Sequence, residues 1–455
     1  MMLGIRKLHF IGIGGVGMSG IAEILHNSGF TVCGSDCSDS EHVTRLRQLG
    51  INIHIGHAPG NVAPDTDICV FSSAVRSDNV EIIAANKMNI PVIKRAMVLA
   101  ELMRIKDGIA IAGSHGKSTT TAICGKVFID SGADPTVIIG GRFDYIKGNA
   151  QLGKGDFLIA EADESDRSFL HLSPVINIVT SIDNDHLDTY GTLADLKRSF
   201  AEFMNKVPFF GFNIVNADDD NIKSILSAVT ARYLTYGLDP GADYRAEDIS
   251  FKGRGMEFRA VKRGADLGVF SIPYPGEHYV ANALSVIALT DMLSMDQEPV
   301  RRSLSSYSGL SRRMEYMGTY NGAAVYNDYG HHPTEIKCTL GSFVKLKKNR
   351  LITVFQPHRF TRTKMLFKEF SRCFDDTDLL FIADIYAASE DPIPGINSKV
   401  LAEKIGKRKR NGIIYLGNTD IKNALEGIRP AAGDIILFLG AGNYFENARR
   451  LVNED

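Results

Sequence analysis

Short runs of apolar residues recur along this chain, and each ends in glycine or a polar residue before a segment with helical periodicity. The runs are residues 7–13, 68–71, 157–160, 175–179, 323–326, 351–355, 379–383 and 434–439. Continuous apolar strands that alternate with helices are typical of parallel sheets, because helices bury both faces of such a strand. The pattern therefore predicts an α/β fold.

The chain has 455 residues, which is more than one hydrophobic core usually supports. We predict three domains, with boundaries at 1–106, 107–308 and 309–455. Inside the second domain, residues 232–275 are rich in glycine and alternate in polarity, which favours a small β element. Residues 279–306 have a helical pattern.

Composition excludes several classes of protein. No apolar run is long enough to cross a bilayer, and the first residues run directly into a strand-like segment without a cleavable signal, so we expect a cytoplasmic protein without membrane partners. The six cysteines show no paired spacing, which favours reduced, buried thiols. A net charge of −2 without a long basic block argues against nucleic acid as a partner.

A glycine-rich turn, Gly12-Ile-Gly-Gly-Val-Gly17, follows the first strand and precedes a helix at 18–27. Glycines let the backbone approach a pyrophosphate at a helix N-terminus, and an acid about 20 residues further on is placed to bind a ribose hydroxyl. Asp36, at the end of the next strand-like run, is that acid. The turn predicts a nucleotide ligand; the alternative is that these glycines serve only close strand–helix packing.

A second loop, Gly113-Ser-His-Gly-Lys-Ser-Thr-Thr-Thr121, also lies between a strand and a helix. It reads G-x-x-G-K-S and is shorter than the usual phosphate-binding loop G-x-x-x-x-G-K-[ST], because Ile111 stands where the first glycine would be. Backbone N–H groups at a helix start can still surround a triphosphate, with Lys117 on the β- and γ-phosphates and Ser118 on Mg²⁺. We predict ATP or GTP binding; the alternative is a loop that only caps a helix.

Two later strands end in acidic clusters, Glu161-Ala-Asp-Glu-Ser-Asp166 and Asp183-Asn-Asp-His-Leu-Asp188. The carboxyl ends of strands are where an open parallel sheet presents ligand groups, and phosphoryl transfer requires ligands for Mg²⁺. We expect Glu161 and His186 to contact the metal, although a nitrogen ligand is unusual for Mg²⁺. Solvated loop charges are the alternative for either cluster alone.

The last domain has polar groups at two further strand ends, residues 327–335 and 355–362. Arg359 and Arg362, spaced i and i+3, are predicted to share a helical face and to grip a carboxylate. Surface arginines and capping histidines are the alternatives. Nucleotide, ATP and carboxylate sites in one chain suggest a ligase in which a carboxylate attacks the γ-phosphate and an amine then displaces phosphate from the acyl phosphate.

The short loop resembles the ATP loop of the Mur ligase family, and further matches cover nearly the whole chain. They are Phe10-Ile-Gly-Ile-Gly-Gly-Val-Gly-Met-Ser-Gly20, Glu161-Ala-Asp-Glu-Ser165, Asp185-His-Leu-Asp-Thr-Tyr190, Gly309-Leu-Ser-Arg-Arg313, Asp328-Tyr-Gly-His-His-Pro-Thr-Glu335, Phe355-Gln-Pro-His-Arg359 and Asp384-Ile-Tyr-Ala-Ala388. The resemblance implies a Rossmann-like N-terminal domain, a central P-loop ATPase-type α/β domain and a Rossmann-like C-terminal domain. It also implies peptidoglycan precursor synthesis, in which L-alanine is joined to the lactyl carboxylate of UDP-N-acetylmuramate with ATP and Mg²⁺, giving ADP and phosphate.

The resemblance assigns residues to four ligands. The ATP site would comprise Gly113, Ser114, His115, Gly116, Lys117, Ser118, Thr119, His278, Asn282, Arg312 and Asp328. The UDP-sugar site would comprise Gly14, Gly15, Val16, Gly17, Asp36, Ser72 and Ser73. The amino-acid site would comprise Tyr329, His331, Arg359 and Arg362. The metal site would comprise Ser118, Glu161 and His186, and the groups acting in catalysis would be Lys117, Glu161, His186 and Arg313.

Three other functions are open from the sequence. A related ligase that adds a recycled tripeptide to the same nucleotide sugar would have similar motifs. A dinucleotide-dependent oxidoreductase would use the Gly12–Gly17 turn but would leave the loop at 113–121 unexplained. A nucleotide-gated binding protein would bind ATP without turnover that depends on an amine. The sequence leaves open whether the protein is a monomer or a homodimer.

Overall fold

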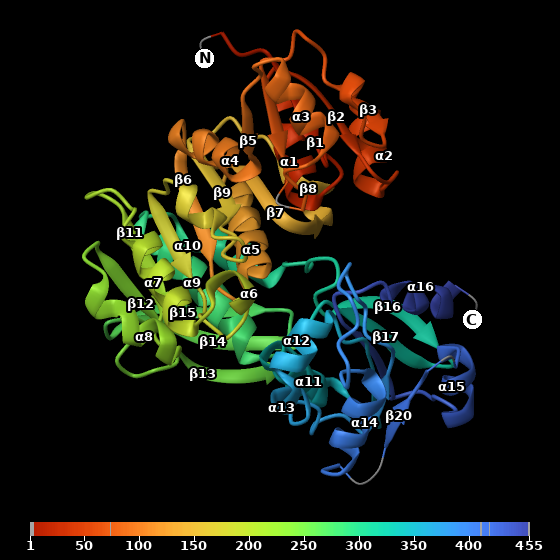
Figure 1. The fold of residues 1–455 in the computed structure, drawn as a ribbon. Coiled ribbons are helices and arrows are strands. Elements are labelled where there is room, and N and C mark those ends of the chain that lie inside the picture. The colour runs from red at the N-terminus through yellow and green to blue at the C-terminus, as the bar shows by residue number, and fades with distance from the viewer. Residues whose placement is uncertain (1–3, 73, 410–411, 418, 454–455) are drawn as a thin grey trace. The chain divides into compact units, whose positions relative to one another are not determined.

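The computed structural model describes residues 4–72, 74–409, 412–417 and 419–453, and these residues form three sheets in an α/β fold, as predicted (Figure 1). Every apolar run singled out above overlaps a strand over most of its length. The segment 232–275 holds four strands, as the alternating pattern indicates. The helical stretch 279–306 is two helices rather than one, because the chain breaks at a left-handed Ser294 and Asp296 caps a new helix.

The N-terminal sheet is parallel throughout and has the order β3-β2-β1-β4-β5. Its elements are β1 (Lys7–Ile11), α1 (Val16–Asn27), β2 (Thr31–Asp36), α2 (Glu41–Gln48), β3 (Asn52–Ile55), β4 (Ile68–Phe71), α3 (Val80–Lys87), β5 (Val92–Lys94) and α4 (Arg95–Arg104). The strand order reverses between β1 and β4, and open α/β sheets bind ligands at such a switch point, beyond the carboxyl ends of the strands. The Gly12–Gly17 turn follows β1, so it lies at this point.

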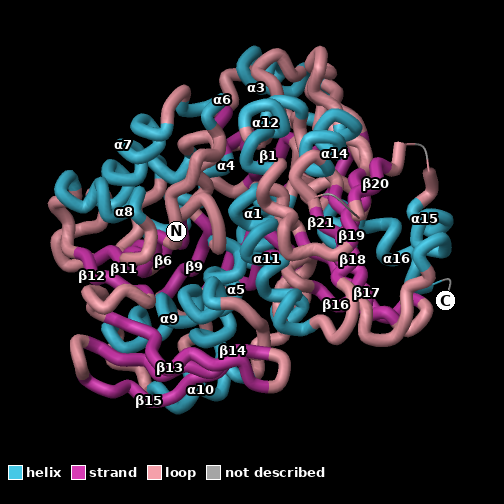
Figure 2. Tube along the Cα trace, turned by 90° about the horizontal axis from the view of Figure 1, so that it is seen from below, coloured by secondary structure: helices cyan, strands magenta, loops and turns pink. Residues whose placement is uncertain are grey.

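The second sheet has ten strands in the order β15-β14-β13-β12-β11-β10-β6-β9-β7-β8. Its strands are β6 (Asp107–Ala112), β7 (Thr136–Phe143), β8 (Gly148–Gln151), β9 (Phe157–Glu161), β10 (Ile176–Val179), β11 (Phe212–Asn216), β12 (Tyr233–Gly237), β13 (Tyr244–Lys252), β14 (Gly255–Lys262) and β15 (Ala265–Ile272). Its helices are α5 (Lys117–Asp130), α6 (Leu187–Tyr190), α7 (Leu193–Met204), α8 (Asp220–Ile225), α9 (Glu277–Met292) and α10 (Gln297–Ser305). Strand β6 pairs in parallel with β10 and β9, so the two acidic strand ends flank the loop that follows β6. Figure 2 shows β13, β14 and β15 as neighbouring strands.

The third sheet has the order β16-β17-β21-β18-β19-β20, with β16 antiparallel to β17 and the other pairs parallel. Its elements are β16 (Glu315–Tyr320), β17 (Ala323–Asp328), α11 (Pro333–Leu346), β18 (Leu351–Phe355), α12 (Phe360–Met365), α13 (Phe367–Phe370), β19 (Leu379–Ile382), α14 (Ser398–Gly406), β20 (Ile413–Tyr415), α15 (Ile421–Ile428), β21 (Ile435–Leu439) and α16 (Phe445–Asn453). Helix α11 begins with Pro333 after a capping box between His332 and Glu335.

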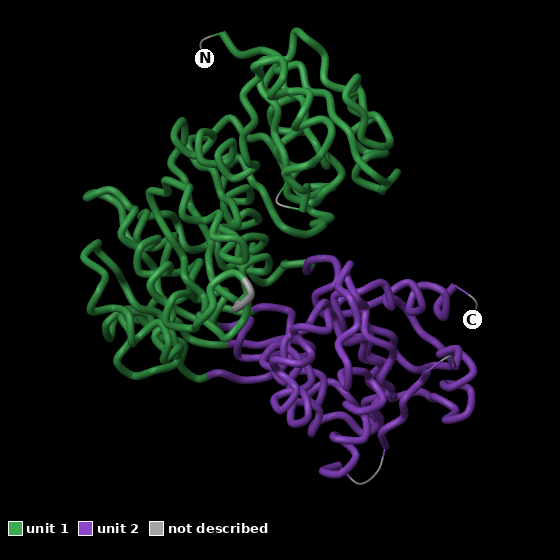
Figure 3. The backbone as a smooth tube through the Cα atoms, viewed as in Figure 1, with its two compact units in different colours: residues 1–248, 258–271, 281–308 green, residues 249–257, 272–280, 309–455 purple. Residues whose placement is uncertain are grey.

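The chain forms two compact units, coloured separately in Figure 3. The first contains residues 1–248, 258–271 and 281–308, and the second contains 249–257, 272–280 and 309–455. A continuous apolar core in the first unit joins the N-terminal sheet to the second sheet, with Phe10, Phe169, Phe200 and Phe203 fully buried. The N-terminal and central domains therefore share buried surface.

None of the helices in the described parts of the chain combines the length and the apolar character that a membrane span requires. Of the six cysteines, Cys69, Cys124 and Cys373 are buried as predicted. Cys37 and Cys338 are exposed, so the prediction of burial was wrong for these two.

Candidate active site

The short glycine loop joins β6 to α5 and leaves the start of that helix open. Gly116 precedes the helix with a φ of 83°, in the left-handed region, and no described side chain caps α5 there. The first N–H groups of a helix have no partner within the helix, and they lie at the positive end of its dipole. The loop therefore has the backbone geometry of an anion site.

The loop is held against the end of β10. A Cβ on Gly113, which has a φ of 140°, would lie 2.1 Å from Thr180 Oγ1, so only glycine fits. The Ser114 N–H donates to the Ser181 carbonyl at 2.9 Å, and His115 Nε2 lies 2.9 Å from Asp183 Oδ2. These contacts fix the shape of the loop before any ligand is bound.

Lys117 is held by a carboxylate that the sequence interpretation did not select. Its Nζ donates to the Gly113 carbonyl at 2.6 Å and to Glu164 Oε1 at 3.0 Å. The Glu164 side chain is fully buried. Burial opposes the charge on Lys117, but Glu164 and Asp163 raise its pKa above the ordinary value. Lys117 therefore stays charged at the start of α5.

Ser118 and Glu161, both predicted metal ligands, face each other. Ser118 Oγ donates to Glu161 Oε2 at 3.1 Å, and the Gly140 N–H donates to Glu161 Oε1 at 2.5 Å. A Cβ on Gly140 would lie 2.6 Å from Oε2, so glycine gives the carboxylate room. A hydroxyl and a carboxylate at this spacing are hard oxygen donors, which fit Mg²⁺.

His186, the third predicted metal ligand, lies beside Glu164. Its Nε2 is 3.7 Å from Glu164 Oε1 and 3.6 Å from Asp185 Oδ2. Its φ of 57° puts its backbone in the left-handed region, which is uncommon outside glycine. The structure thus brings together Lys117 at the start of α5, Glu164 after β9 and His186 after β10. Ser118 and Glu161 are close in sequence to Lys117 and Glu164.

The glycine turn after β1 is closed by Asp36. Its Oδ2 accepts the Gly14 N–H at 2.8 Å, and the side chain is largely buried. A cavity of about 510 Å³ adjoins the turn and is lined by residues from four segments. They include Gly12, Gly14, Gly15, Asp36, His57 and Ser72. Ser73, also predicted for this site, lies outside the described residues.

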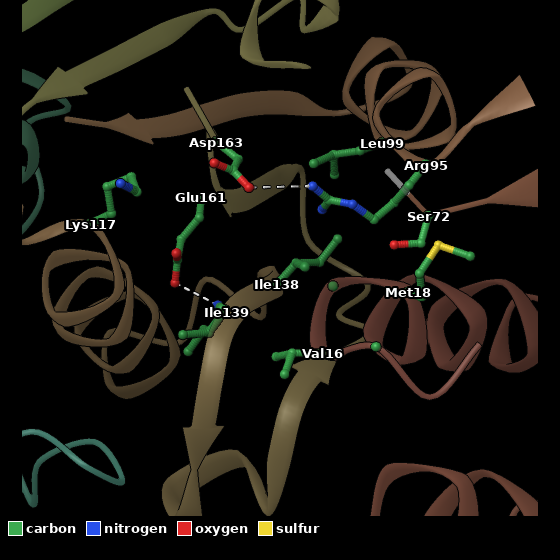
Figure 4. Close-up of a pocket in the computed structure, with 13 residues that line it drawn as sticks. Val16, Met18, Ser72, Arg95, Leu99, Lys117, Ile138, Ile139, Glu161 and Asp163 are labelled. Atoms are coloured by element: carbon green, nitrogen blue, oxygen red, sulfur yellow. Dashed lines mark hydrogen bonds and ion pairs between the residues drawn. The ribbon is translucent and has the colours of Figure 1, made fainter. Parts of the chain in front are cut away.

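A second cavity, of about 330 Å³, joins this turn to Lys117 (Figure 4). Its walls include Gly15 to Met18 and Ser72 from the N-terminal domain, and Lys117, Ile138 to Gly140, Glu161 and Asp163 from the central domain. Arg95, the first residue of α4, points into it, with Nη2 3.9 Å from Asp163 Oδ2. The sequence interpretation missed Arg95, because no motif surrounds it.

On α9, Asn282 is buried and close to the loop, since a Cβ on Gly116 would lie 3.0 Å from Asn282 Oδ1. His278, predicted with it as an adenine contact, belongs to the first turn of the same helix. Burial lowers the pKa of His278 to about 4, and the charges of Arg313 and Lys345 act in the same direction. His278 is therefore neutral at physiological pH.

In the second unit, Arg312 and Arg313 pack on one aromatic ring. Arg312 lies 4.7 Å from the centre of the Tyr329 ring and donates to the Gly440 carbonyl at 2.8 Å. Arg313 lies 5.4 Å from the same ring and 3.7 Å from Glu335. The structure thus places these predicted site residues at the ends of β17 and β21.

Asp328 ends β17 with its carboxylate buried. Its Oδ2 accepts the Met314 N–H and its Oδ1 accepts the Gly330 N–H, each at 2.8 Å. Burial raises its pKa, although Arg313 and these two bonds act in the opposite direction. Each carboxylate oxygen thus accepts one backbone N–H within the domain.

The argument that Arg359 and Arg362 share a helical face was wrong. Helix α12 begins at Phe360, and Arg359 precedes it with a φ of 69°. Arg359 Nη1 lies 3.9 Å from Glu390, whereas Arg362 Nη1 lies 3.2 Å from His358 Nδ1. The His358 and His331 rings are 6.0 Å apart, so Arg362 and His331 belong to one cluster.

A glycine turn at a switch point, a G-x-x-G-K-S loop at a helix start and carboxylates facing Lys117 and Ser118 define a nucleotide-dependent α/β enzyme of the phosphate-loop class. The chain belongs to the Mur ligase family. Residues 7–107 match the model described as Mur ligase family, catalytic domain; residues 111–290 match the Mur ligase middle domain; and residues 312–442 match the Mur ligase, glutamate ligase domain.

Relatives match over the whole length. The chain is 47% identical over 452 residues to the UDP-N-acetylmuramate–L-alanine ligase of Geotalea daltonii, covering 99% of this chain and 98% of the relative. It is 47% identical over 447 residues to the enzyme of that name from Geobacter sulfurreducens, with 97% and 96% covered. The crystal structure of UDP-N-acetylmuramate–alanine ligase from Thermotoga maritima is similar with a TM-score of 0.83 and 28% identity, over 98% of each chain.

Proposed function

We propose that this enzyme joins L-alanine to the lactyl carboxylate of UDP-N-acetylmuramate with ATP, in the synthesis of peptidoglycan precursors. The observation that carries the proposal is the 47% identity over 99% of the chain to a ligase of that name. The geometry at the start of α5 supports it, because Lys117 is charged beside an open helix N-terminus where a triphosphate fits.

In the proposed reaction, an oxygen of the lactyl carboxylate attacks the γ-phosphorus of ATP, and the bond between that phosphorus and the β–γ bridging oxygen breaks to release ADP. The amine nitrogen of L-alanine then attacks the acyl carbon, phosphate leaves, and the amine proton passes to a base. Lys117 and the first N–H groups of α5 stabilise the negative charge on the transferring phosphoryl group.

We assign Mg²⁺ to Ser118, Glu161 and His186; the oxygens of the first two face each other at 3.1 Å, and His186 lies 3.7 Å from Glu164. When bound, the ion would neutralise phosphate charge. Asn282 would contact ATP, as would His278, Arg312 and Asp328, and Arg313 would act at the transferred phosphate. The turn at 12–17, Asp36 and Ser72 would bind the UDP-sugar. Tyr329, His331, Arg359 and Arg362 would bind L-alanine. We place the enzyme in the cytoplasm, where ATP and nucleotide sugars are made, and assign domains to 1–106, 107–308 and 309–455.

The test is phosphate release from MgATP and UDP-N-acetylmuramate, in parallel reactions with L-alanine, with L-alanyl-γ-D-glutamyl-meso-diaminopimelate or with no amine. Release that requires L-alanine, with a product heavier by one alanyl residue, is the expected result. Release that requires the tripeptide would identify a recycling ligase instead. Failure of every reaction, with ATP still bound, would favour a binding protein.

The variant Lys117→Ala tests the role of Lys117 in the same assay. We expect phosphate release to fall by about 10²–10³-fold or more, since a preorganised cation at the transferred group is lost. Binding of UDP-N-acetylmuramate, measured by calorimetry without ATP, should persist. Undiminished turnover in this variant would remove Lys117 from the mechanism.

A further inference from the structure

The cavity of about 330 Å³ between the Gly15–Gly17 turn and Lys117 is lined by two cations, Arg95 and Lys117. Lys117 is already held at 2.6 Å by the Gly113 carbonyl and at 3.0 Å by the buried Glu164. Arg95 differs, because its ion pair with Asp163 is long, at 3.9 Å. A guanidinium has five N–H donors, so Arg95 keeps capacity for a further acceptor.

The partner of Arg95 is also easily replaced. The Asp163 side chain is 42% exposed and the Arg95 side chain is 19% exposed, and an ion pair at 3.9 Å with one partly exposed member contributes little. Asp163 Oδ1 accepts the Ser165 N–H at 3.0 Å, which remains when Arg95 turns away. An oxyanion gripped by two guanidinium N–H groups forms a stronger contact than this pair.

Gly17 makes room for the guanidinium. Glycine inside a helix costs stability relative to alanine, so its presence in the first turn of α1 calls for a packing reason. A Cβ on Gly17 would lie 2.7 Å from Arg95 Nη1 and 3.1 Å from Cζ. Arg95 is therefore seated directly against the turn at the start of α1, and Figure 4 shows it between that turn and Asp163.

We propose that Arg95 binds an oxyanion of the nucleotide-sugar substrate where the substrate passes from the Gly15–Gly17 turn toward Lys117. The proposal rests on the proposed function and extends it by one binding residue. Two groups of that substrate have the required chemistry, the diphosphate and the lactyl carboxylate. Glu161 and Asp163 line the same cavity and repel anions. Arg95 offsets this repulsion on the path of the substrate.

The experiment is calorimetric binding of UDP-N-acetylmuramate without ATP to the wild type and to Arg95→Ala, Arg95→Lys and Asp163→Asn. Arg104→Ala is the control, because Arg104 ends the same helix with its side chain 61% exposed. We expect Arg95→Ala to weaken binding about 10- to 100-fold, as for loss of a charge-assisted hydrogen bond. Arg95→Lys should retain part of the affinity, and Arg104→Ala should bind normally.

Asp163→Asn separates substrate binding from a structural role. If Arg95 binds substrate, this variant keeps or gains affinity, because the competing charge is gone. If Arg95 serves only to pair with Asp163, the two variants lose affinity equally, and that result overturns the proposal. Wild-type affinity in Arg95→Ala also overturns it. Should Arg95→Ala fail to fold, the comparison of Arg95→Lys with Asp163→Asn decides in the same way.

UDP and UDP-N-acetylglucosamine, which lack the lactyl group, identify the oxyanion. A loss in Arg95→Ala shared by all three ligands assigns the contact to the diphosphate, and a loss confined to UDP-N-acetylmuramate assigns it to the carboxylate; both support the proposal. In turnover, the KM for the nucleotide sugar should rise while the KM for ATP does not. If the wild type does not bind UDP-N-acetylmuramate, the proposed function fails. If the wild type and Arg95→Ala bind it equally well, only the proposal for Arg95 fails.

Discussion

Replacement of Glu81 by glutamine should lower the free energy of unfolding of the N-terminal domain by up to about 3 kcal/mol at pH 7. Glu81 lies on α3, and its buried carboxylate is 3.0 Å from His9 Nε2 on β1, which is also fully buried. Ser35 Oγ donates to the same oxygen at 2.6 Å, and Asn61 Nδ2 and the Ala58 N–H donate to the other at 2.6 and 3.1 Å. Glutamine keeps an acceptor for the last two donors but removes the charge opposite His9.

The magnitude follows from the pKa of His9. Burial alone would lower this pKa, but the hydrogen bonds to Cys33 and Glu81 and the electrostatic effects of the same two groups raise it from 6.5 to about 9, so Glu81 accounts for part of the shift. A difference of that size corresponds to about 3 kcal/mol in favour of the folded, charged state. The same interaction lowers the pKa of Glu81 to about 2, although burial acts in the opposite direction. Both pKa shifts arise from one ion pair, so its free energy is counted once.

The pH dependence has a definite sign. A folded-state pKa above the unfolded value means that the contribution is complete below pH 6.5 and is lost as the pH rises through about 9. The wild type and Glu81→Gln should therefore differ most near pH 6 to 7 and converge above pH 9.

Hydrogen–deuterium exchange with mass spectrometry measures the local opening. Peptides covering β1 and residues 56–61 should exchange up to about a hundredfold faster in Glu81→Gln at pH 7, which corresponds to about 3 kcal/mol. Glu101→Gln is the matched control, since Glu101 is half exposed and pairs with Arg104 within one helix. Equal protection in Glu81→Gln and the wild type at pH 7, or a difference that persists unchanged above pH 9, would refute the reasoning.

Two further predictions concern the proposed ligand sites. Ser118→Ala should raise the Mg²⁺ concentration needed for half-maximal turnover by about tenfold, whereas Ser118→Thr, which keeps the hydroxyl, should stay near the wild type; a magnesium titration of initial rates distinguishes them. Arg359→Ala should raise the KM for L-alanine by about tenfold and leave the KM for ATP unchanged, because a cation near the amino-acid carboxylate is lost. Equal changes in both constants would place Arg359 elsewhere.

The strands and the loops between them could be predicted because they depend on local pattern. Buried parallel strands read as short apolar runs, and residues 351–355 form β18 with the predicted bounds. The carboxyl ends of neighbouring strands meet at one edge, so the contact between Ser118 after β6 and Glu161 at the end of β9 was foreseeable.

Other features depend on geometry that spacing does not encode. The i, i+3 spacing of Arg359 and Arg362 matches a helix, but the chain enters α12 through a left-handed residue, so the two guanidinium groups meet different partners. Arg95 lies outside every motif, and its guanidinium lies against Gly17 of helix α1, which is far from it in the sequence. The sequence shows that residues 161–164 are acidic, but it does not show which carboxylate is buried. Burial is what distinguishes Glu164, which pairs with Lys117, from Glu161, which faces Ser118.

The different positions of Glu161 and Glu164 explain how the loop places a cationic side chain and a metal-binding hydroxyl side by side. Lys117 and Ser118 are adjacent, and each faces its own carboxylate, Glu164 for the ammonium and Glu161 for the hydroxyl. Glu164 is fully buried and lies against the ammonium of Lys117, whereas Glu161 accepts the Gly140 N–H and the Ser118 hydroxyl, the latter being one of the two predicted oxygen ligands. Glu161 and Asp163 line the same wall of the cavity, and their carboxylates repel phosphate unless a cation is bound beside them. In the proposed reaction, Glu161 would hold Mg²⁺, which would supply that positive charge, and Arg95 would supply it along the path from the nucleotide turn.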